Sequence, residues 1–283
     1  MQINNPENAN DYYASAGNLR SGNRVTRTLL TGEEGTPHNY KFNYGGGGDS
    51  GDWTTPRHRH NFEQVRHPIA GDYVIAKNQV LPAGWVAYFP ESAYYGPQVK
   101  SGNLTMLSLQ FGGPSGIGYW SVAQRKRGYE ELVEKGEFHE GIFTWRDEQG
   151  RKHNQDAAQA VWEQVFGRKI EYASPRDPEF IMMDPAAFDW RKDDEAKGVA
   201  WKRLGTFTER ELKIALIQLD KGAAISLGRE KSNEILFLKE GRISQGGQDF
   251  GRLTAFSTTA EERPETFTAS EDCELFYVKL PSF

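Results

Sequence analysis

Between about Thr26 and Phe111, short hydrophobic segments alternate with breaks made of glycine, proline and asparagine. The segments read YKFNY, QVRHPIAGDYVIA, GWVAYFP and LTMLSLQF. Runs of this length, rich in β-branched and aromatic residues and bounded by turn formers, are typical of strands. This part of the chain is therefore predicted to form antiparallel β-sheet.

The pattern changes after Gly118. The segment SVAQRKRGYEELVEKGE has a serine suited to helix capping, Ser121, and glycine at its end. The segment NQDAAQAVWEQVFGRK carries one apolar helical stripe before the terminating Gly167, made of Ala157, Ala160, Val161 and Val165. Two helices are predicted here, followed by the proline-containing linker YASPRDPEF and the polar connection DPAAFDWRKDDEAKG.

Strand signals return from Trp201 in LKIALIQLD, EILFLKEGRIS, RLTAFS and CELFYVKL. The stretch NEILFLKEGRI is similar to FEQVRHPIAGDYV, because each has a polar start, a hydrophobic strand, a glycine and another strand. We interpret them as diverged copies of one β-fold. The predicted boundaries are a first β-unit at 20–120, a helical insert and linker at 121–195, and a second β-unit at 196–283.

Charge and composition narrow the partners. The net charge of −5 gives no basic field for nucleic acid or an anionic membrane, so a small molecule is the expected ligand. A single cysteine, Cys273, excludes an internal disulfide and a cysteine-rich metal site. No apolar run is long enough for a membrane span, and the first residues lack the features of a signal peptide. We expect a soluble, cytoplasmic protein.

The segment HRHNFEQ carries the strongest chemical signal. Side chains alternate in a strand, so His58, His60 and Gln64 share one face. In an unbroken strand Glu63 and His67 point to the other face, whereas a bulge near position 61 would turn Glu63 inward; both arrangements stay open. Paired imidazoles suit a divalent transition metal (Fe, Mn, Ni, Cu or Zn), and the alternative is a hydrogen-bonded pair of polar residues.

These residues resemble the cupin superfamily. Its first motif is Gly, five residues, His-x-His, three or four residues, Glu, six residues, Gly. Here it is matched by Gly51, His58, His60, Gln64 and Gly71, with one extra residue after the first Gly. The second motif is matched in spacing by GWVAYFPESAYYGPQV, with Ser92 at its second Gly, Tyr95 at its His and Val99 at its Asn.

The resemblance implies a mainly β fold, a bicupin of two jelly-roll barrels with a short helical insert between them. Cupins hold a metal through the two histidines, the Glu and the second-motif His. Their positions here are His58, His60, Gln64 (or Glu63) and Tyr95. In the second barrel the Glu-six-Gly spacing survives at Glu234 and Gly241, but no histidine precedes it, so this barrel is expected to have lost its site.

Two classes of function follow. The first is a metal-dependent enzyme acting on a small organic molecule, with Tyr95 or Glu63 moving a proton; by analogy within the superfamily a dioxygenase-type oxidoreductase is favoured, and a lyase or isomerase stays open. The second is a non-enzymatic bicupin that binds a small ligand or a partner protein. Barrel edges that need covering are also compatible with a homodimer.

Overall fold

The computed structural model describes residues 1–9, 11–13, 21–22, 25–46, 53–100 and 103–283. The chain divides into two compact units. The N-terminal unit comprises Asp11–Thr28 and Gly32–Met182, and the C-terminal unit comprises Met1–Asn10, Leu29–Thr31 and Met183–Phe283. The glycine-rich segment at 45–51 lies mostly outside the described residues, and Gly51 of the first motif is among those left out.

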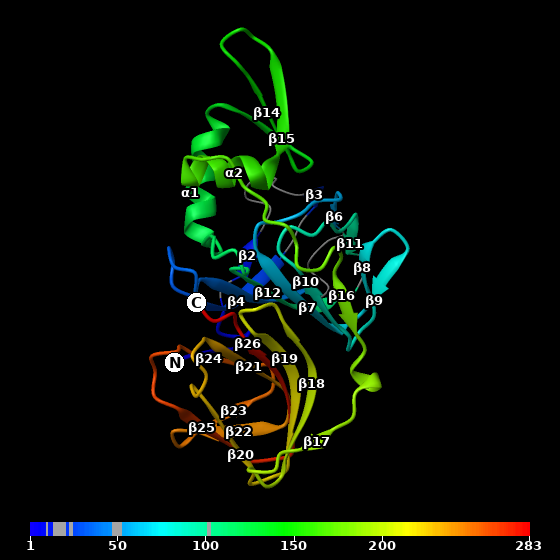
Figure 1. Cartoon of the computed structure of the whole chain (residues 1–283), viewed down its shortest axis with the longest axis vertical. Helices are drawn as coiled ribbons and strands as arrows, with labels where there is room; N and C mark the ends of the chain where they lie inside the picture. Colours follow the sequence, from blue (N-terminus) through cyan, green and yellow to red (C-terminus); the bar gives the residue numbers. More distant parts are fainter. Residues whose placement is uncertain (10, 14–20, 23–24, 47–52, 101–102) are drawn as a thin grey trace. The chain divides into compact units, whose positions relative to one another are not determined.

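The N-terminal unit is built mainly from antiparallel sheets (Figure 1). One sheet has the order β16-β10-β7-β12-β5-β4-β2: β16 (Ile181–Met183), β10 (Val86–Phe89), β7 (Glu63–Ala70), β12 (Thr105–Phe111), β5 (Tyr40–Gly46), β4 (Val25–Thr31) and β2 (Asp11–Tyr13). The other has the order β3-β6-β11-β8-β9: β3 (Ser21–Gly22), β6 (Trp53–Thr55), β11 (Gln98–Lys100), β8 (Tyr73–Ala76) and β9 (Gln79–Leu81). Their apolar side chains meet in one buried cluster that includes Tyr73, Ile75, Phe89 and Met106.

Strand β7, which follows the histidine pair, lies between β10 and β12. Gln64 is opposite Phe89 of β10 on one side and Gln110 of β12 on the other. Directly opposed residues in antiparallel strands share a face. The face of β7 that carries Gln64 and Arg66 is therefore the face that meets the other sheet, because Phe89 belongs to the cluster between them.

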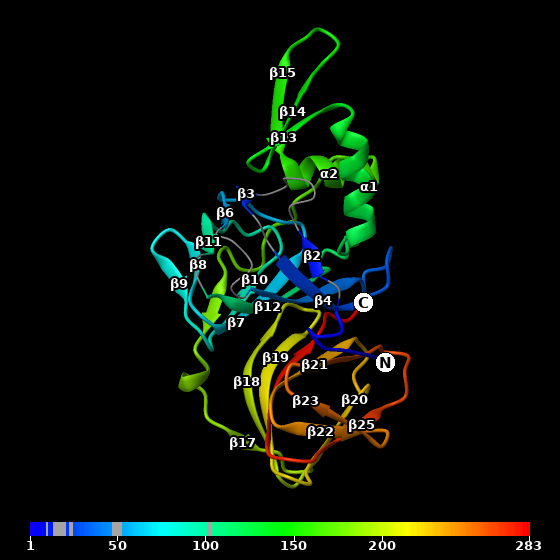
Figure 2. The ribbon, with the colours of Figure 1, turned by 180° about the vertical axis from the view of Figure 1, so that it is seen from behind.

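The C-terminal unit repeats this plan with an apolar interior. One sheet has the order β1-β24-β21-β26-β19-β18-β17, and the other β20-β25-β22-β23 (Figure 2). The bounds are β1 (Gln2–Asn4), β17 (Arg191–Lys192), β18 (Val199–Phe207), β19 (Leu212–Leu219), β20 (Ala224–Leu227), β21 (Glu234–Glu240), β22 (Arg242–Gln245), β23 (Gln248–Gly251), β24 (Ala255–Thr258), β25 (Glu265–Ala269) and β26 (Cys273–Lys279). Strand β1 pairs antiparallel with β24, so the first residues of the chain complete the second barrel, which the sequence did not predict.

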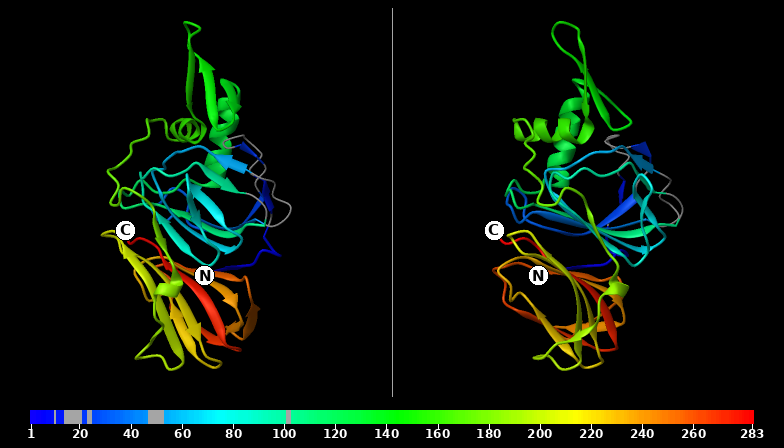
Figure 3. Two further views of the ribbon diagram at one scale, coloured as in Figure 1. Left: turned by 90° about the vertical axis from the view of Figure 1, so that its right-hand side faces the viewer. Right: turned by 45° about the vertical axis from the view of Figure 1, so that its right-hand side comes forward.

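The insert contains the two predicted helices, α1 (Val122–Val133) and α2 (Ala157–Phe166). Ser121 caps α1 in a capping box with Gln124, and α2 ends at Gly167 in the left-handed conformation. An unpredicted sheet joins them: β13 (Gly136–His139), β14 (Ile142–Arg146) and β15 (Lys152–Asp156), whose last two strands extend away from the helices in Figure 3. In the part of the chain that the structure describes, no helix has the length and apolar composition needed to cross a bilayer.

The mainly β fold class, with helices between its halves, is therefore confirmed. The predicted strand segments correspond to β5, β7, β8, β10 and β12 in the first unit and to β19, β21, β22, β24 and β26 in the second. The polar connection before the second unit is less irregular than expected, since it contains a 3-10 turn at Pro185–Ala187 and the short strand β17.

Candidate metal and ligand site

A backbone bridge brings His58 and Tyr95 together. The N–H of each donates to the carbonyl oxygen of the other over 3.0 Å, which makes an antiparallel pair outside the named strands. The ring centroids of His58 lie 4.5 Å from Tyr95 and 4.9 Å from His60, and those of His60 and Tyr95 are 6.0 Å apart. Three of the predicted site residues therefore converge, although they come from segments more than 30 residues apart.

His58 is oriented by a backbone contact. Its Nδ1 lies 2.6 Å from the carbonyl oxygen of Pro56. A carbonyl can only accept, so Nδ1 is the protonated nitrogen and, in the neutral ring, Nε2 carries the lone pair. His60 is held by stacking on Phe62, with centroids 4.4 Å apart. A metal-binding histidine usually has its second ring nitrogen tethered to a carbonyl or carboxylate, as Nδ1 of His58 is here.

Gln64 has a different role from the one its motif position implies. Its Nε2 donates to the hydroxyl of Tyr95, while its Oε1 accepts from Arg66 Nη2 at 2.6 Å and from Gln110 Nε2 at 3.0 Å. Because a guanidinium only donates, the amide oxygen must be the atom that faces Arg66. The structure thus places Gln64 beside Tyr95, with its NH₂ fixing the Tyr95 hydroxyl and its oxygen engaged by Arg66 and Gln110.

Glu63 lies on the opposite face of β7. The chain bends at residues 61 and 62 and β7 begins only at Glu63, so the strand predicted from His58 onward is interrupted. From Glu63 to His67 the register with β12 runs without a bulge, which sets Glu63 on the face opposite to Gln64. The Glu63 carboxylate is fully buried and accepts a hydrogen bond from the hydroxyl of Tyr88. Burial, and then the charge of Glu63, raise the pKa of Tyr88 far above its usual value. Glu63 does not join His58, His60 and Tyr95.

His67 shares that opposite face. It is fully buried, and its Nδ1 lies 2.8 Å from the carbonyl oxygen of Trp85. This contact anchors β7 to the segment before β10, as a packing histidine does.

Arg66 belongs to the site and was missed in the sequence. Its guanidinium donates to Gln64 Oε1 and, over 3.1 Å, to the hydroxyl of Ser108. The signal was present, since Arg66 is two residues after Gln64 and so shares its face.

The donor set fits a divalent transition metal through His58, His60 and the Tyr95 oxygen. Imidazole nitrogens and a phenolate oxygen are accepted ligands for such ions. Among the described residues no group of three His, Cys, Asp or Glu side chains is positioned to hold a metal. Any metal here would therefore depend on the tyrosine rather than on a carboxylate.

No protein-family model matches this sequence, and no curated protein matches it. Solved structures do match. A proposed dioxygenase of Nostoc punctiforme has a TM-score of 0.63 at 11% identity, covering 99% of this chain and 82% of that one. Streptomyces albus HEPD, with 2-hydroxyethylphosphonate and Fe(II) bound, has a TM-score of 0.56 at 9% identity and coverages of 99% and 76%. Bacillus subtilis oxalate decarboxylase, whose Mn(II) centres have been studied, has a TM-score of 0.51 at 11% identity and coverages of 100% and 78%.

The chain has the bicupin fold. Identities near one in ten establish this fold alone and leave the activity open.

The second barrel of this bicupin has no comparable cluster of histidines. His153 is the last histidine of the sequence, so β18 to β26 contain none. Glu234, at the surviving motif position, accepts a hydrogen bond from the hydroxyl of Tyr277 over 2.6 Å, within a largely apolar interior. Burial, followed by the charge of Glu234, strongly raises the pKa of Tyr277, so Tyr277 stays a neutral phenol.

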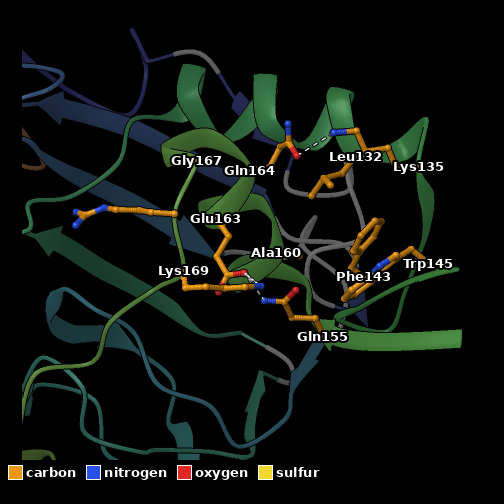
Figure 4. A pocket seen from close by; sticks show the side chains of 11 residues that line it. Leu132, Lys135, Phe143, Trp145, Gln155, Ala160, Glu163, Gln164, Gly167 and Lys169 are labelled. Atoms are coloured by element: carbon orange, nitrogen blue, oxygen red, sulfur yellow. Dashed lines mark hydrogen bonds and ion pairs between the residues drawn. The ribbon is translucent and has the colours of Figure 1, made fainter. Parts of the chain in front are cut away.

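A separate cleft of about 400 Å³ lies in the helical insert (Figure 4). Phe143 and Trp145 line one side of it, and Glu163 lines another. Burial raises the pKa of Glu163, but hydrogen bonds from Gln159, Lys169 and the Gln155 amide outweigh it and lower the pKa to about 2. Because its one carboxylate, Glu163, is already paired with Lys169, the cleft carries less chemistry than the histidine cluster.

Proposed function

We propose that this bicupin is a metal-dependent enzyme that acts on a small organic molecule, with dioxygenation as its reaction. The observation that carries the proposal is the convergence of His58, His60 and Tyr95, with Nδ1 of His58 tied to the Pro56 carbonyl. That tether prepares Nε2 to act as a ligand. The solved structures with Fe(II) and Mn(II) support the choice of a divalent transition metal.

A bound metal would supply Lewis-acid activation of the substrate. The protein's own residues would do the rest. Tyr95 holds an exchangeable proton beside the histidines, and Gln64 fixes the position of that hydroxyl. Phe89 packs against the Tyr95 ring at 4.7 Å, and Phe62 covers His60, so aromatic rings limit the access of water to this side of the cluster.

A second candidate is a bicupin that binds a small molecule without a metal. The engagement of the Gln64 oxygen by Arg66 and Gln110 favours it, because it withdraws the atom that the motif position would offer to a cation. A lyase or isomerase is a further variant of the enzyme proposal, in which Tyr95 transfers the proton without consumption of dioxygen.

Elemental analysis of the purified protein tests the proposal. His60→Ala is compared with His139→Ala, a matched control whose side chain is 86% exposed in the insert. We expect near one equivalent of Fe, Mn, Ni, Cu or Zn in the parent and in His139→Ala, and little in His60→Ala. Dioxygen uptake with candidate substrates then separates the oxygenase from the lyase.

Parent protein that remains metal-free after titration with all five ions would overturn the enzyme proposal and leave the metal-free binding protein. Retention of the metal by His60→Ala would place the ion elsewhere. Cu(II) loading gives an independent readout, since nitrogen hyperfine structure in its EPR spectrum reports imidazole ligation and should weaken in His60→Ala.

A further inference from the structure

Arg66 is a buried cation whose hydrogen-bond partners are both neutral. Its side chain is 4% exposed, and it donates only to the Gln64 amide oxygen and the Ser108 hydroxyl. Its Nε–H is buried without a hydrogen-bond partner. No carboxylate among the described residues lies within ion-pair distance of the guanidinium. A buried charge is strongly unfavourable unless it is paired, so this arrangement calls for an anion.

Among the described residues of β5, β7, β10 and β12, none on the face that carries Arg66 is acidic. In β7, β10 and β12 the residues sharing this face are Gln64, Arg66, Pro68, Ala87, Phe89, Met106, Ser108 and Gln110. The register of β5 adds Lys41, which is itself buried, and Asn43. The described strands thus present positive charge and neutral hydrogen-bonding groups toward the same interior.

The guanidinium is oriented as well as buried. Gln64 and Ser108 each accept a hydrogen bond from one Nη nitrogen, whereas the buried Nε has no hydrogen-bond partner. A fork edge of two parallel N–H groups is the geometry that binds a carboxylate in a bidentate manner. Gln64 links the guanidinium to the Tyr95 hydroxyl, since its Oε1 accepts from Arg66 Nη2 and its Nε2 donates to Tyr95.

We propose that Arg66 binds the carboxylate of a small organic acid and that such acids are the substrate class of the site. The inference rests on the proposed function for the reaction, and on Arg66 alone for the binding. A carboxylate held at Arg66 sets the rest of a short molecule beside Gln64, Tyr95 and the histidine pair. The acid neutralises the buried guanidinium and takes up its orphaned Nε–H.

Binding of acetate and pyruvate to metal-stripped protein, measured by calorimetry and by thermal shift, tests the inference. Acetamide and pyruvamide serve as neutral probes of the same shape. We expect the acids to bind and raise the melting temperature, and the amides to do neither. Arg66→Met should weaken acid binding at least about tenfold, because a charge-assisted bidentate contact is lost. Arg252→Met, an exposed arginine of the C-terminal unit, should bind as the parent does.

Gln64→Glu decides the case if Arg66→Met does not fold. It is isosteric and sets a permanent carboxylate where Oε1 already contacts Arg66. We expect it to fold and to abolish binding of the acids. Equal acid binding by the parent and either variant overturns the inference, and so does a parent that binds neither acid.

Metal content measured on the same preparations separates the two proposals. If Arg66→Met loses acid binding and the parent takes up no metal, Arg66 is an anion site and the metalloenzyme proposal is wrong. If the parent binds metal and Arg66→Met binds the acids as well as the parent does, the metalloenzyme proposal stands and the carboxylate site is wrong.

Discussion

The side-chain amide of Gln64 donates a hydrogen bond to the hydroxyl oxygen of Tyr95. These residues occupy the acid position of the first motif and the histidine position of the second, so a neutral amide and a phenol replace a carboxylate and an imidazole. The two residues act together, because the Gln64 NH₂ orients the Tyr95 hydroxyl while the Gln64 oxygen accepts a hydrogen bond from Arg66. The neutral amide therefore brings no negative charge to the guanidinium that it contacts.

Tyr95→Phe tests the role of that hydroxyl. The variant leaves the buried Gln64 NH₂ without its acceptor, which should lower the free energy of unfolding by about 1–3 kcal/mol. If Tyr95 moves the proton, turnover should fall by about 10²–10⁴-fold. Urea unfolding and steady-state kinetics measure the two effects, and Tyr94→Phe, at the exposed neighbouring tyrosine, is the control. Unchanged turnover in a stable Tyr95→Phe would remove Tyr95 from the chemistry.

Tyr88→Phe should destabilise the N-terminal unit without disabling the site. The Tyr88 hydroxyl donates to the buried carboxylate of Glu63 on the face of β7 away from the histidines. Removing this donor should cost about 1–3 kcal/mol in the free energy of unfolding. Metal content and acid binding should be unchanged in the folded fraction. A variant of parental stability that has lost its metal would contradict this assignment of faces.

The insert should lose stability in acid because of Glu163. Hydrogen bonds that outweigh the effect of burial hold the folded pKa near 2, below the ordinary value of 4.5. A lowered folded pKa stabilises the protein fully above the unfolded pKa, and the contribution declines as pH falls from about 4.5 toward 2. Thermal unfolding of the parent and Glu163→Gln should differ at pH 7 and converge as the pH approaches 2. A difference independent of pH would show that the carboxylate charge is not responsible.

Gly167→Ala should destabilise α2 through backbone strain alone. Gly167 has φ of +63°, and a Cβ added there would meet no atom within 4 Å. The left-handed conformation costs an alanine about 1–2 kcal/mol, with no clash to add to it. Urea unfolding measures the change, while Gly251→Ala, also in open space but without a positive φ, should cost less. Equal costs at the two positions would contradict the argument.

Local patterns predicted the elements well. The strands β7, β10 and β12 follow from alternation and turn residues, and α2 follows from its apolar stripe and Gly167. The pleat also predicts that Gln64 and Arg66 share a face, because side-chain direction depends only on the backbone period. The sequence alone therefore determined a mainly β chain with a helical insert and a candidate histidine cluster.

The tertiary structure decided which side chains contact one another. The orientation of Glu63 stayed open until its pairing with β12 placed it on the face of β7 opposite to Gln64. The Gln64 oxygen is engaged by Gln110, which lies 46 residues further along the chain, and the N-terminal strand β1 pairs with β24 across about 250 residues. Backbone geometry sets the face on which a side chain lies, and this is a local property. The groups it meets there depend on the register between strands distant in sequence, which forms only when the sheets pack.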